Sequence, residues 1–201
     1  VPEMFGAEQL LMNRAADKAT FEQVVQMIND FKDYFISHDQ PIYENPSPGN
    51  KEGGLTTLED KSLGATQKGG QATVTQVLDY SERLEPKGGL ALLYGPGNDG
   101  VSSTNMVAAG ATLLLFTTGR GTPLGFPVPT LKISSNTAIA EKKPHWIDFN
   151  AGALLDGEVT MDEMTDQLFE MILDTATGKY QARNEENDYR EIAIWKEGVT
   201  L

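Results

Sequence analysis

Apolar side chains recur at helical spacing near the start of the chain. The stripe consists of Phe21, Val24, Val25, Ile28, Phe31 and Phe35. Its spacing predicts an amphipathic helix over residues 20–37, with Thr20 as a suitable N-cap. Residues 6–16 are rich in helix-forming residues and predict a helix before it. Such a stripe is typical of packing on a core.

Short, uninterrupted apolar runs separated by polar, glycine-rich turns follow from residue 89 onward. They predict strands over residues 89–94, 111–116, 129–134 and 145–149, and a last candidate strand over 191–195. A helix is expected over residues 101–110, with Ser102 or Ser103 near its N-cap. A second helix is expected over 160–177, where Thr160 and Glu163 match a capping box and Gly178 is a stop.

The alternation of strands and helices predicts an α/β fold. Continuous apolar strands favour a mainly parallel sheet with helices on both faces, a Rossmann-like three-layer arrangement. Residues 39–72 are rich in glycine and proline and are expected to form an ordered, functional loop region, with a short helix at about 55–62. We therefore expect two parts, a helical and glycine-rich segment over residues 1–85 and an α/β domain over 86–201.

Composition narrows the classes of function. The chain has a net charge of −13, which disfavours nucleic acid and anionic membranes as partners. It has no cysteine and two histidines, which excludes disulfides, thiolate metal sites and a multi-histidine centre. No apolar run is long enough to span a membrane. These features predict an acidic, globular, cytoplasmic protein. Because the sequence starts at Val1, we expect it to continue from a missing upstream domain.

Polar loops follow three of the predicted strands, at residues 95–99, 117–123 and 150–152. In a parallel sheet such loops gather at one edge, where ligands bind. Glycines let main-chain N–H groups approach an anion, and Arg120 can bind a carboxylate through two hydrogen bonds. The remaining candidates are the hydrogen-bonding residues Asn98, Thr117, Thr118 and Asn150, and the acid–base or hard-cation ligands Glu3, Asp99 and Asp148. This set suits a small, anionic, hydroxyl-rich ligand.

Three lysines lie among the glycines of the loop region. They are Lys51, Lys61 and Lys68, with Asn45, Asn50 and Ser62 nearby. A lysine can neutralise a substrate carboxylate or, when desolvated, act as a base.

Each of these features also has a purely structural interpretation. Residues 95–97 can form a tight turn, Asp99 can cap a helix, and Arg120 can belong to a surface ion pair. Asp148 can be an exposed strand residue, and the lysines can be solvated. The two histidines are also read as structural, His145 at a strand start and His38 near a helix end. The chain contains no complete dinucleotide-binding loop, P-loop or hydrolase nucleophile elbow.

Taken in order, several motifs resemble the altronate/galactarate dehydratase family. In the first half they are Asn45-Pro46-Ser47-Pro48-Gly49-Asn50-Lys51, Gly53-Gly54-Leu55-Thr56-Thr57-Leu58-Glu59, Lys61-Ser62-Leu63-Gly64 and Lys68-Gly69-Gly70. In the second half they are Phe116-Thr117-Thr118-Gly119-Arg120-Gly121-Thr122-Pro123, Asp148-Phe149-Asn150-Ala151-Gly152 and the terminal Ile194-Trp195-Lys196-Glu197-Gly198-Val199-Thr200-Leu201. The segment Lys143-Pro144-His145-Trp146-Ile147-Asp148 is more similar to altronate than to galactarate members.

The resemblance implies the C-terminal catalytic region of a hydro-lyase that converts D-altronate to 2-keto-3-deoxy-D-gluconate. It implies a divalent metal, iron(II), which would neutralise the enediolate and assist departure of hydroxide. The substrate would be surrounded by the residues proposed above. Lys51, Lys61, Lys68, Asp99 and Asp148 would be catalytic candidates, and Asn50, Ser62, Asn98, Thr117, Thr118, Arg120 and Asn150 substrate-binding candidates.

Galactarate dehydration is the alternative reaction. A module that binds a sugar acid without turnover, or loops that only pack between domains, are the alternatives to an enzyme. Family members carry an upstream domain and a Gly-Gly-Ser-Asp segment that are absent here, and Ala65 stands where relatives often have cysteine. We therefore expect the 201-residue chain alone to be inactive. Its expected partners are the upstream domains of the same protein. Whether it also forms a homo-oligomer is left open by the sequence.

Overall fold

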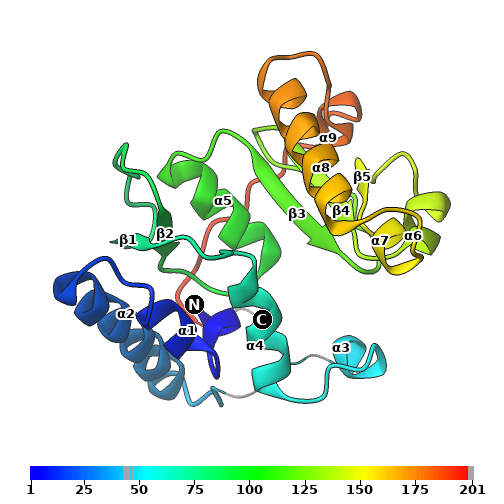
Figure 1. Cartoon of the computed structure of the whole chain (residues 1–201). Coiled ribbons are helices and arrows are strands. Elements are labelled where there is room, and N and C mark those ends of the chain that lie inside the picture. Colours follow the sequence, from blue (N-terminus) through cyan, green and yellow to red (C-terminus); the bar gives the residue numbers. More distant parts are fainter. Residues whose placement is uncertain (43–45, 47, 199–201) are drawn as a thin grey trace. The chain divides into compact units, whose positions relative to one another are not determined.

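The computed structural model describes residues 1–42, 46 and 48–198, and the chain divides into two compact units (Figure 1). Unit 1 comprises Val1–Gly110 together with the C-terminal tail from Ile194, and unit 2 comprises Ala111–Ala193. Unit 2 is therefore inserted into the sequence of unit 1. The boundary expected after residue 85 lies inside unit 1. That residues 1–85 continue from an upstream domain stays a prediction.

Unit 1 is built from short helices and two parallel strands. Its elements are η1 (Pro2–Met4), α1 (Glu8–Met12), α2 (Lys18–Ser37), α3 (Pro48–Glu52), α4 (Leu58–Gln67), β1 (Val74–Leu78), β2 (Leu90–Leu93) and α5 (Asp99–Ala109). Most of the predicted stripe of α2 is confirmed, since Val24, Ile28, Phe31 and Phe35 are buried in the core of unit 1. Phe21 is exposed and Val25 is only partly buried. The helix begins two residues early, because Asp17 rather than Thr20 caps it by accepting from the Thr20 N–H (2.8 Å).

Other helix ends also differ from the sequence-based expectation. The helix α5 is capped by Asn98, whose Oδ1 accepts from the Val101 N–H (3.2 Å), and not by Ser102 or Ser103. It ends at Gly110, whose φ of 118° is a left-handed conformation that glycine tolerates. The short helix expected at 55–62 is α4, which Thr57 caps and which continues to Gln67. These shifts place Asp99 in the first turn of α5 and Lys61 within α4.

The strand β1 was absent from the sequence-based prediction. It pairs in parallel with β2, yet Gln76 interrupts its apolar pattern and is itself buried. The amide of Gln76 donates to the Glu85 carbonyl oxygen (3.1 Å) and accepts from the Glu85 N–H (3.0 Å). A polar side chain satisfied in this way can occupy a strand interior.

The C-terminal tail completes the core of unit 1. The expected strand over 191–195 is wrong, because these residues belong to no strand. Trp195 instead packs against aromatic rings, with centroids 5.3 Å from Tyr34, 5.3 Å from Tyr80 and 6.0 Å from Phe31. The Tyr34 hydroxyl donates to the Gly198 carbonyl oxygen (2.9 Å) and accepts from the Gly198 N–H (2.7 Å).

Unit 2 is a three-stranded parallel sheet covered by helices. Its elements are β3 (Leu114–Thr118), β4 (Thr130–Ser134), α6 (Thr137–Lys142), β5 (Phe149–Asn150), α7 (Gly152–Leu155), α8 (Met161–Ala176) and α9 (Arg183–Glu186), with strand order β3-β4-β5. The predicted α/β class with parallel strands is confirmed, although the strands form two small sheets. The capping box of α8 is also confirmed.

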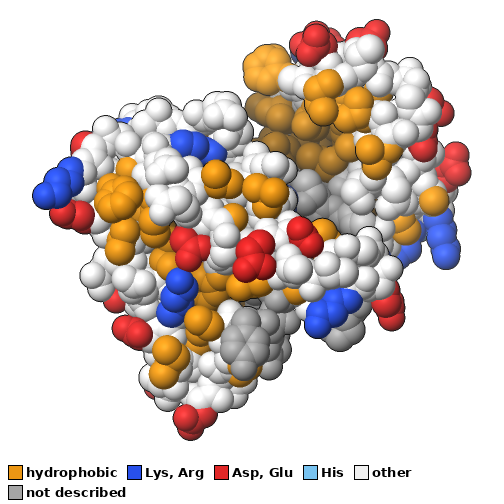
Figure 2. All heavy atoms as spheres, turned by 60° about the horizontal axis from the view of Figure 1, so that its bottom comes forward, with side chains coloured by type: hydrophobic (Ala, Val, Ile, Leu, Met, Phe, Trp, Pro, Cys, Tyr) orange, Lys and Arg blue, Asp and Glu red, His pale blue; other side chains and the backbone are white. Residues whose placement is uncertain are grey.

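The two faces of the unit 2 sheet are covered differently. On one face Met164 of α8 packs with Ile133 and Phe149. On the other face Phe126 is buried and stacks on Phe116 (ring centroids 6.5 Å apart). On the surface, apolar side chains lie between carboxylates and cations (Figure 2). Within the described ranges, no helix has both the length and the apolar character that a membrane span requires.

Candidate functional site

Four charged residues of unit 1 come together from three elements, and we call them the acid–base cluster. They are Glu3 of η1, Lys61 of α4, Lys68 directly after α4 as its C-cap, and Asp99 of α5. The main-chain nitrogen of Val1 donates to the Gly95 carbonyl oxygen (2.8 Å), which holds η1 against the loop after β2. Gly97 leaves room for Glu3, since a Cβ at position 97 would lie 3.3 Å from Glu3 Oε1. Lys61 and Lys68 are seven residues apart and therefore share one face of α4.

The electrostatics of the acid–base cluster favour proton transfer. Lys61 Nζ lies 3.4 Å from Glu3 Oε1. Although part of Asp99 is exposed, the surrounding protein removes water from its carboxyl and raises its pKa, and the negative charge of Glu3 raises it further. Lys68 and Lys61 oppose this shift. The cluster thus places a carboxyl group with a raised pKa beside two ammonium groups that attract an anion.

The other predicted residues of unit 1 lie on α3, on α4 and at the start of α5. Ser62 is buried and its hydroxyl donates to the Glu59 carbonyl oxygen (3.2 Å). Asn98 is the N-cap of α5. Asn50 and Lys51 lie on α3, where Lys51 is exposed. Asn45 and the last three residues of the terminal motif lie outside the described residues.

In unit 2, Arg120 lies in the loop formed by residues 119–123, which we call the Arg120 loop. The sequence placed Thr117 and Thr118 in the loop after the strand. In the structure they belong to the strand, because β3 extends to Thr118. Thr118 Oγ1 accepts from the Gly121 N–H (2.9 Å), which closes the turn around Arg120. The Arg120 side chain is exposed. This placement leaves a guanidinium beside the carboxyl end of a parallel strand, the usual position of a ligand group in α/β sheets.

Asp148 and Asn150 connect the strands of unit 2 to their surroundings. The Asp148 carboxylate accepts from the Lys132 N–H (2.7 Å), the Arg183 N–H (2.8 Å) and the Tyr180 hydroxyl (2.9 Å). Burial raises the pKa of Asp148, and these hydrogen bonds act in the opposite direction. Asn150 Oδ1 accepts from the Gly152 N–H (2.9 Å). Both side chains are engaged by protein groups of unit 2.

The expectation that three loops share one sheet edge is wrong. The loop after β2 belongs to the two-stranded sheet of unit 1, whereas those after β3 and β5 belong to the sheet of unit 2. The pattern of apolar residues did not reveal this, because it is the same whether Leu90–Leu93 and Leu114–Thr118 pair in one sheet or belong to two. The structure brings Lys61, Lys68 and Asp99 together in unit 1. It places Arg120, Asp148 and Asn150 separately, in unit 2.

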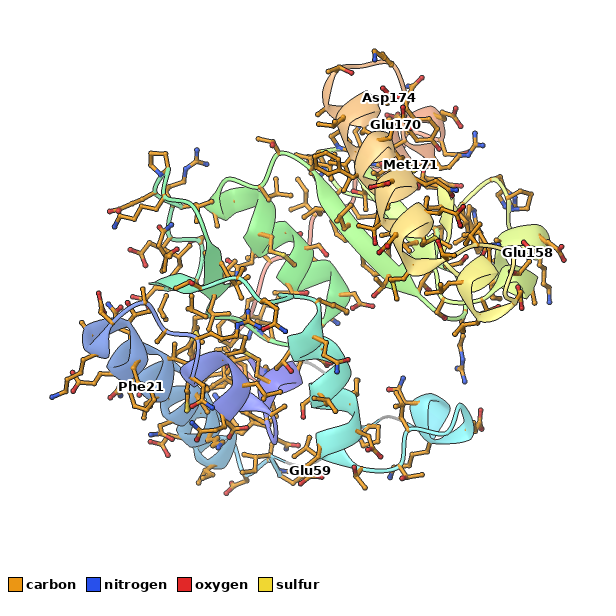
Figure 3. The ribbon with its side chains drawn as sticks, in the orientation of Figure 1. Phe21, Glu59, Glu158, Glu170, Met171 and Asp174 are labelled. Carbon is orange, nitrogen blue, oxygen red and sulfur yellow. The ribbon has the colours of Figure 1, made fainter. Side chains whose placement is uncertain are left out.

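Two open hollows lie apart from the predicted residues. One, of about 230 Å³, is lined by Gln167, Glu170, Met171, Asp174 and Tyr180 on the α8 side of unit 2 (Figure 3). The other, of about 320 Å³, lies in unit 1 beside Asp30, Asp79 and Tyr94. Over the described part of the chain, no three metal-ligating side chains of the His, Cys, Asp or Glu type gather at one place. The His, Asp and Glu side chains of the described residues therefore do not by themselves form a complete metal site.

Comparison with known proteins assigns the chain to a family. The family model described as D-galactarate/altronate dehydratase, C-terminal, matches residues 1–200. Altronate dehydratases of Escherichia coli K12 and Bacillus subtilis 168 are 59% and 56% identical over the whole chain, and galactarate dehydratase (L-threo-forming) of Escherichia coli K12 is 37% identical over 89% of it. The chain spans 40% of the two altronate dehydratases and 34% of the galactarate dehydratase. The chain therefore belongs to the D-galactarate/altronate dehydratase family and corresponds to its C-terminal region.

Proposed function

We propose that this chain is the C-terminal catalytic part of a hydro-lyase that dehydrates D-altronate to 2-keto-3-deoxy-D-gluconate. The higher identity to the two altronate dehydratases than to the galactarate dehydratase supports this choice of substrate. The observation that carries the proposal is the acid–base cluster, in which Asp99 has a raised pKa beside Lys61 and Lys68.

The reaction removes the proton at C2 and the hydroxyl at C3, which leave as water. The remaining enol then rearranges to the 2-keto acid. In our proposal, Lys61 and Lys68 attract the anionic substrate, and their positive charge makes the C2 proton more acidic. The Glu3 carboxylate beside Lys61 accepts that proton. Protonated Asp99 gives its proton to the departing C3 hydroxyl, a role that suits a carboxyl with a raised pKa.

Iron(II), cytoplasmic location and association with the rest of a longer chain also belong to this proposal. Glu3 and Asp99 are two carboxylates, fewer than a hard cation takes from a complete site. The metal would therefore need further ligands from outside the described residues, and none of the steps above depends on it. Self-association into a homo-oligomer also stays a prediction.

The test is an anaerobic dehydration assay of D-altronate and galactarate, with and without iron(II), comparing the full-length protein with the 201-residue chain. We expect keto-deoxy acid from altronate with the full-length protein only. Faster turnover of galactarate than of D-altronate would make galactarate the proposed substrate. Binding of either acid without turnover would favour a binding module.

Lys61→Met in the full-length protein is expected to lower kcat/KM for altronate at least about 10-fold, since a charged contact is worth about 1.5–3 kcal/mol. Lys18→Met is the matched control, because Lys18 is exposed on α2, where it pairs with the exposed Glu22. Equal activities of the two variants would remove Lys61 from the site.

Asp99→Asn is expected to stabilise the folded protein at pH 7 while lowering activity. A carboxyl whose pKa is raised by folding binds its proton more tightly in the folded state, so ionising it costs stability. The contribution of Asp99 to stability should therefore fall as the pH rises from the unfolded pKa, near 4, through the folded pKa. The stability gained by Asp99→Asn should be larger at pH 7 than at pH 3.5. Thermal melts of both proteins at pH 3.5 and 7 measure this. A variant less stable at pH 7 would contradict the raised pKa.

A further inference from the structure

One sequence motif has no role in the proposed reaction. The segment Lys143-Pro144-His145-Trp146 distinguishes altronate from galactarate members in the sequence analysis, and it lies in unit 2 directly after α6. His145 is exposed, and its main-chain oxygen accepts from the Asn187 amide (3.0 Å). The ammonium group of Lys143 points elsewhere, to the Arg120 loop.

The side chain of Lys143 contacts the Arg120 loop along its whole length. Its Nζ donates to the carbonyl oxygen of Arg120 (2.9 Å) and lies 4.6 Å from the centroid of the Trp146 ring. Its stem packs on Gly121, where a Cβ would lie 2.8 Å from Lys143 Cδ. Gly121 has φ +75°, so glycine meets both the conformational and the steric demand there.

The root of the Lys143 side chain is fixed as well. The Lys143 N–H donates to the Ile139 carbonyl oxygen (2.9 Å), and its own carbonyl oxygen accepts from Trp146 N–H (3.0 Å) and Ile147 N–H (3.1 Å). The Trp146 ring lies beside the ammonium group and makes a cation–π contact with it. The side chain of Lys143 thus extends to the Arg120 loop from a main chain that hydrogen bonds hold in place.

The peptide groups on either side are held too. The Asn136 amide donates to the Gly119 carbonyl oxygen (3.0 Å), and the Gly121 N–H donates to Thr118 Oγ1 (2.9 Å). Three successive residues of the loop, Gly119, Arg120 and Gly121, are therefore each fixed through a main-chain atom. The guanidinium of Arg120 stays exposed on a main chain that has little freedom left to lose on binding.

We propose that Lys143 is a positioning residue that fixes the Arg120 loop, so that Arg120 can bind the carboxylate of the substrate. The proposal rests on the proposed function for the identity of the ligand, but not for the contact itself. Lys143 does not touch substrate. It acts through the Arg120 carbonyl oxygen, and its loss should raise KM more than it lowers kcat.

The test uses three variants of the full-length protein. Lys143→Met keeps the stem over Gly121 but removes the ammonium group, Lys143→Arg keeps a cationic donor, and Lys142→Met removes the charge of the neighbouring exposed lysine. We expect Lys143→Met to raise KM for altronate about 10-fold with kcat within about twofold, the size of one charged hydrogen bond. Lys143→Arg should return KM to within about threefold, and Lys142→Met should leave it unchanged.

A second measurement does not depend on activity. Hydrogen exchange of residues 119–121 should be faster in Lys143→Met than in the unsubstituted protein, and unchanged in Lys142→Met. Faster exchange without altronate turnover by any variant would support the positioning role and contradict the proposed function. Unchanged exchange, or a KM within about twofold in Lys143→Met, would overturn the positioning role.

Discussion

Asn184→Ala is expected to lower the free energy of unfolding of unit 2 by about 3–5 kcal/mol, a change large enough to unfold many domains. The Asn184 side chain is fully buried. Its Oδ1 accepts from the Thr130 N–H (2.8 Å), and its Nδ2 donates to the carbonyl oxygens of Phe126 (3.1 Å) and Val128 (3.2 Å). Alanine would remove the partner of the Thr130 N–H and of the Phe126 carbonyl oxygen in a site that Gly125 closes tightly, while the Val128 carbonyl oxygen would keep the Thr130 hydroxyl as a donor (3.0 Å).

The two tryptophans allow this prediction to be measured for unit 2 alone, because Trp146 lies in unit 2 and Trp195 in unit 1. In a Trp195→Phe background, urea unfolding followed by Trp146 fluorescence reports unit 2. Asn187→Ala is the control, since Asn187 is the same residue type, exposed, three positions further on. A loss below about 1 kcal/mol for Asn184→Ala would mean that water replaces the amide.

Trp195→Ala is expected to destabilise unit 1 by about 3 kcal/mol and to leave unit 2 unchanged. The indole of Trp195 packs among the rings of Phe31, Tyr34, Tyr80 and Tyr94. The main-chain N–H of Trp195 donates to the Tyr80 hydroxyl (3.3 Å). Removing the ring opens a cavity beside Phe31, which is itself buried in the core. Because Trp195 is only partly buried, the loss should lie at the lower end of the range for buried aromatic residues.

Hydrogen exchange measures the stability of each unit separately in this variant, in which unit 1 no longer has a tryptophan. Amides of α2 should exchange faster, and those of β4 should be unchanged. Phe169→Ala is the control, because Phe169 is 60% exposed on α8 of unit 2. We expect that control to change stability by no more than about 0.5 kcal/mol. Faster exchange of β4 in Trp195→Ala would show that the units unfold together.

Local sequence signals predicted most of the secondary structure. The stripe of α2 and the capping box of α8 were readable, because both depend on residues three or four apart. The strand β1 was missed, since the amide of Gln76 is satisfied by Glu85, nine residues away. The division into two sheets was also missed, since it depends on which strands pair and not on the character of any strand.

The candidate site was predictable in its residues more than in its arrangement. Lys61, Lys68 and Asp99 were all expected from the sequence, but their proximity depends on η1, which brings Glu3 against Lys61. The contacts of Asp148 with Tyr180 and Arg183 span more than thirty residues and had no local signal. The contact of Lys143 with the Arg120 carbonyl oxygen spans 23 residues and likewise had no local signal.

The tail that carries Trp195 also determines the order in which the chain can fold during synthesis. Residues 111–193 leave the ribosome as one continuous unit, whereas the core of unit 1 needs a residue made after all of them. Domains commonly fold as units in the order of their synthesis. Here the core of unit 1 is completed last, because Trp195 can cover Phe31 and Tyr34 only after translation has passed through the whole of unit 2.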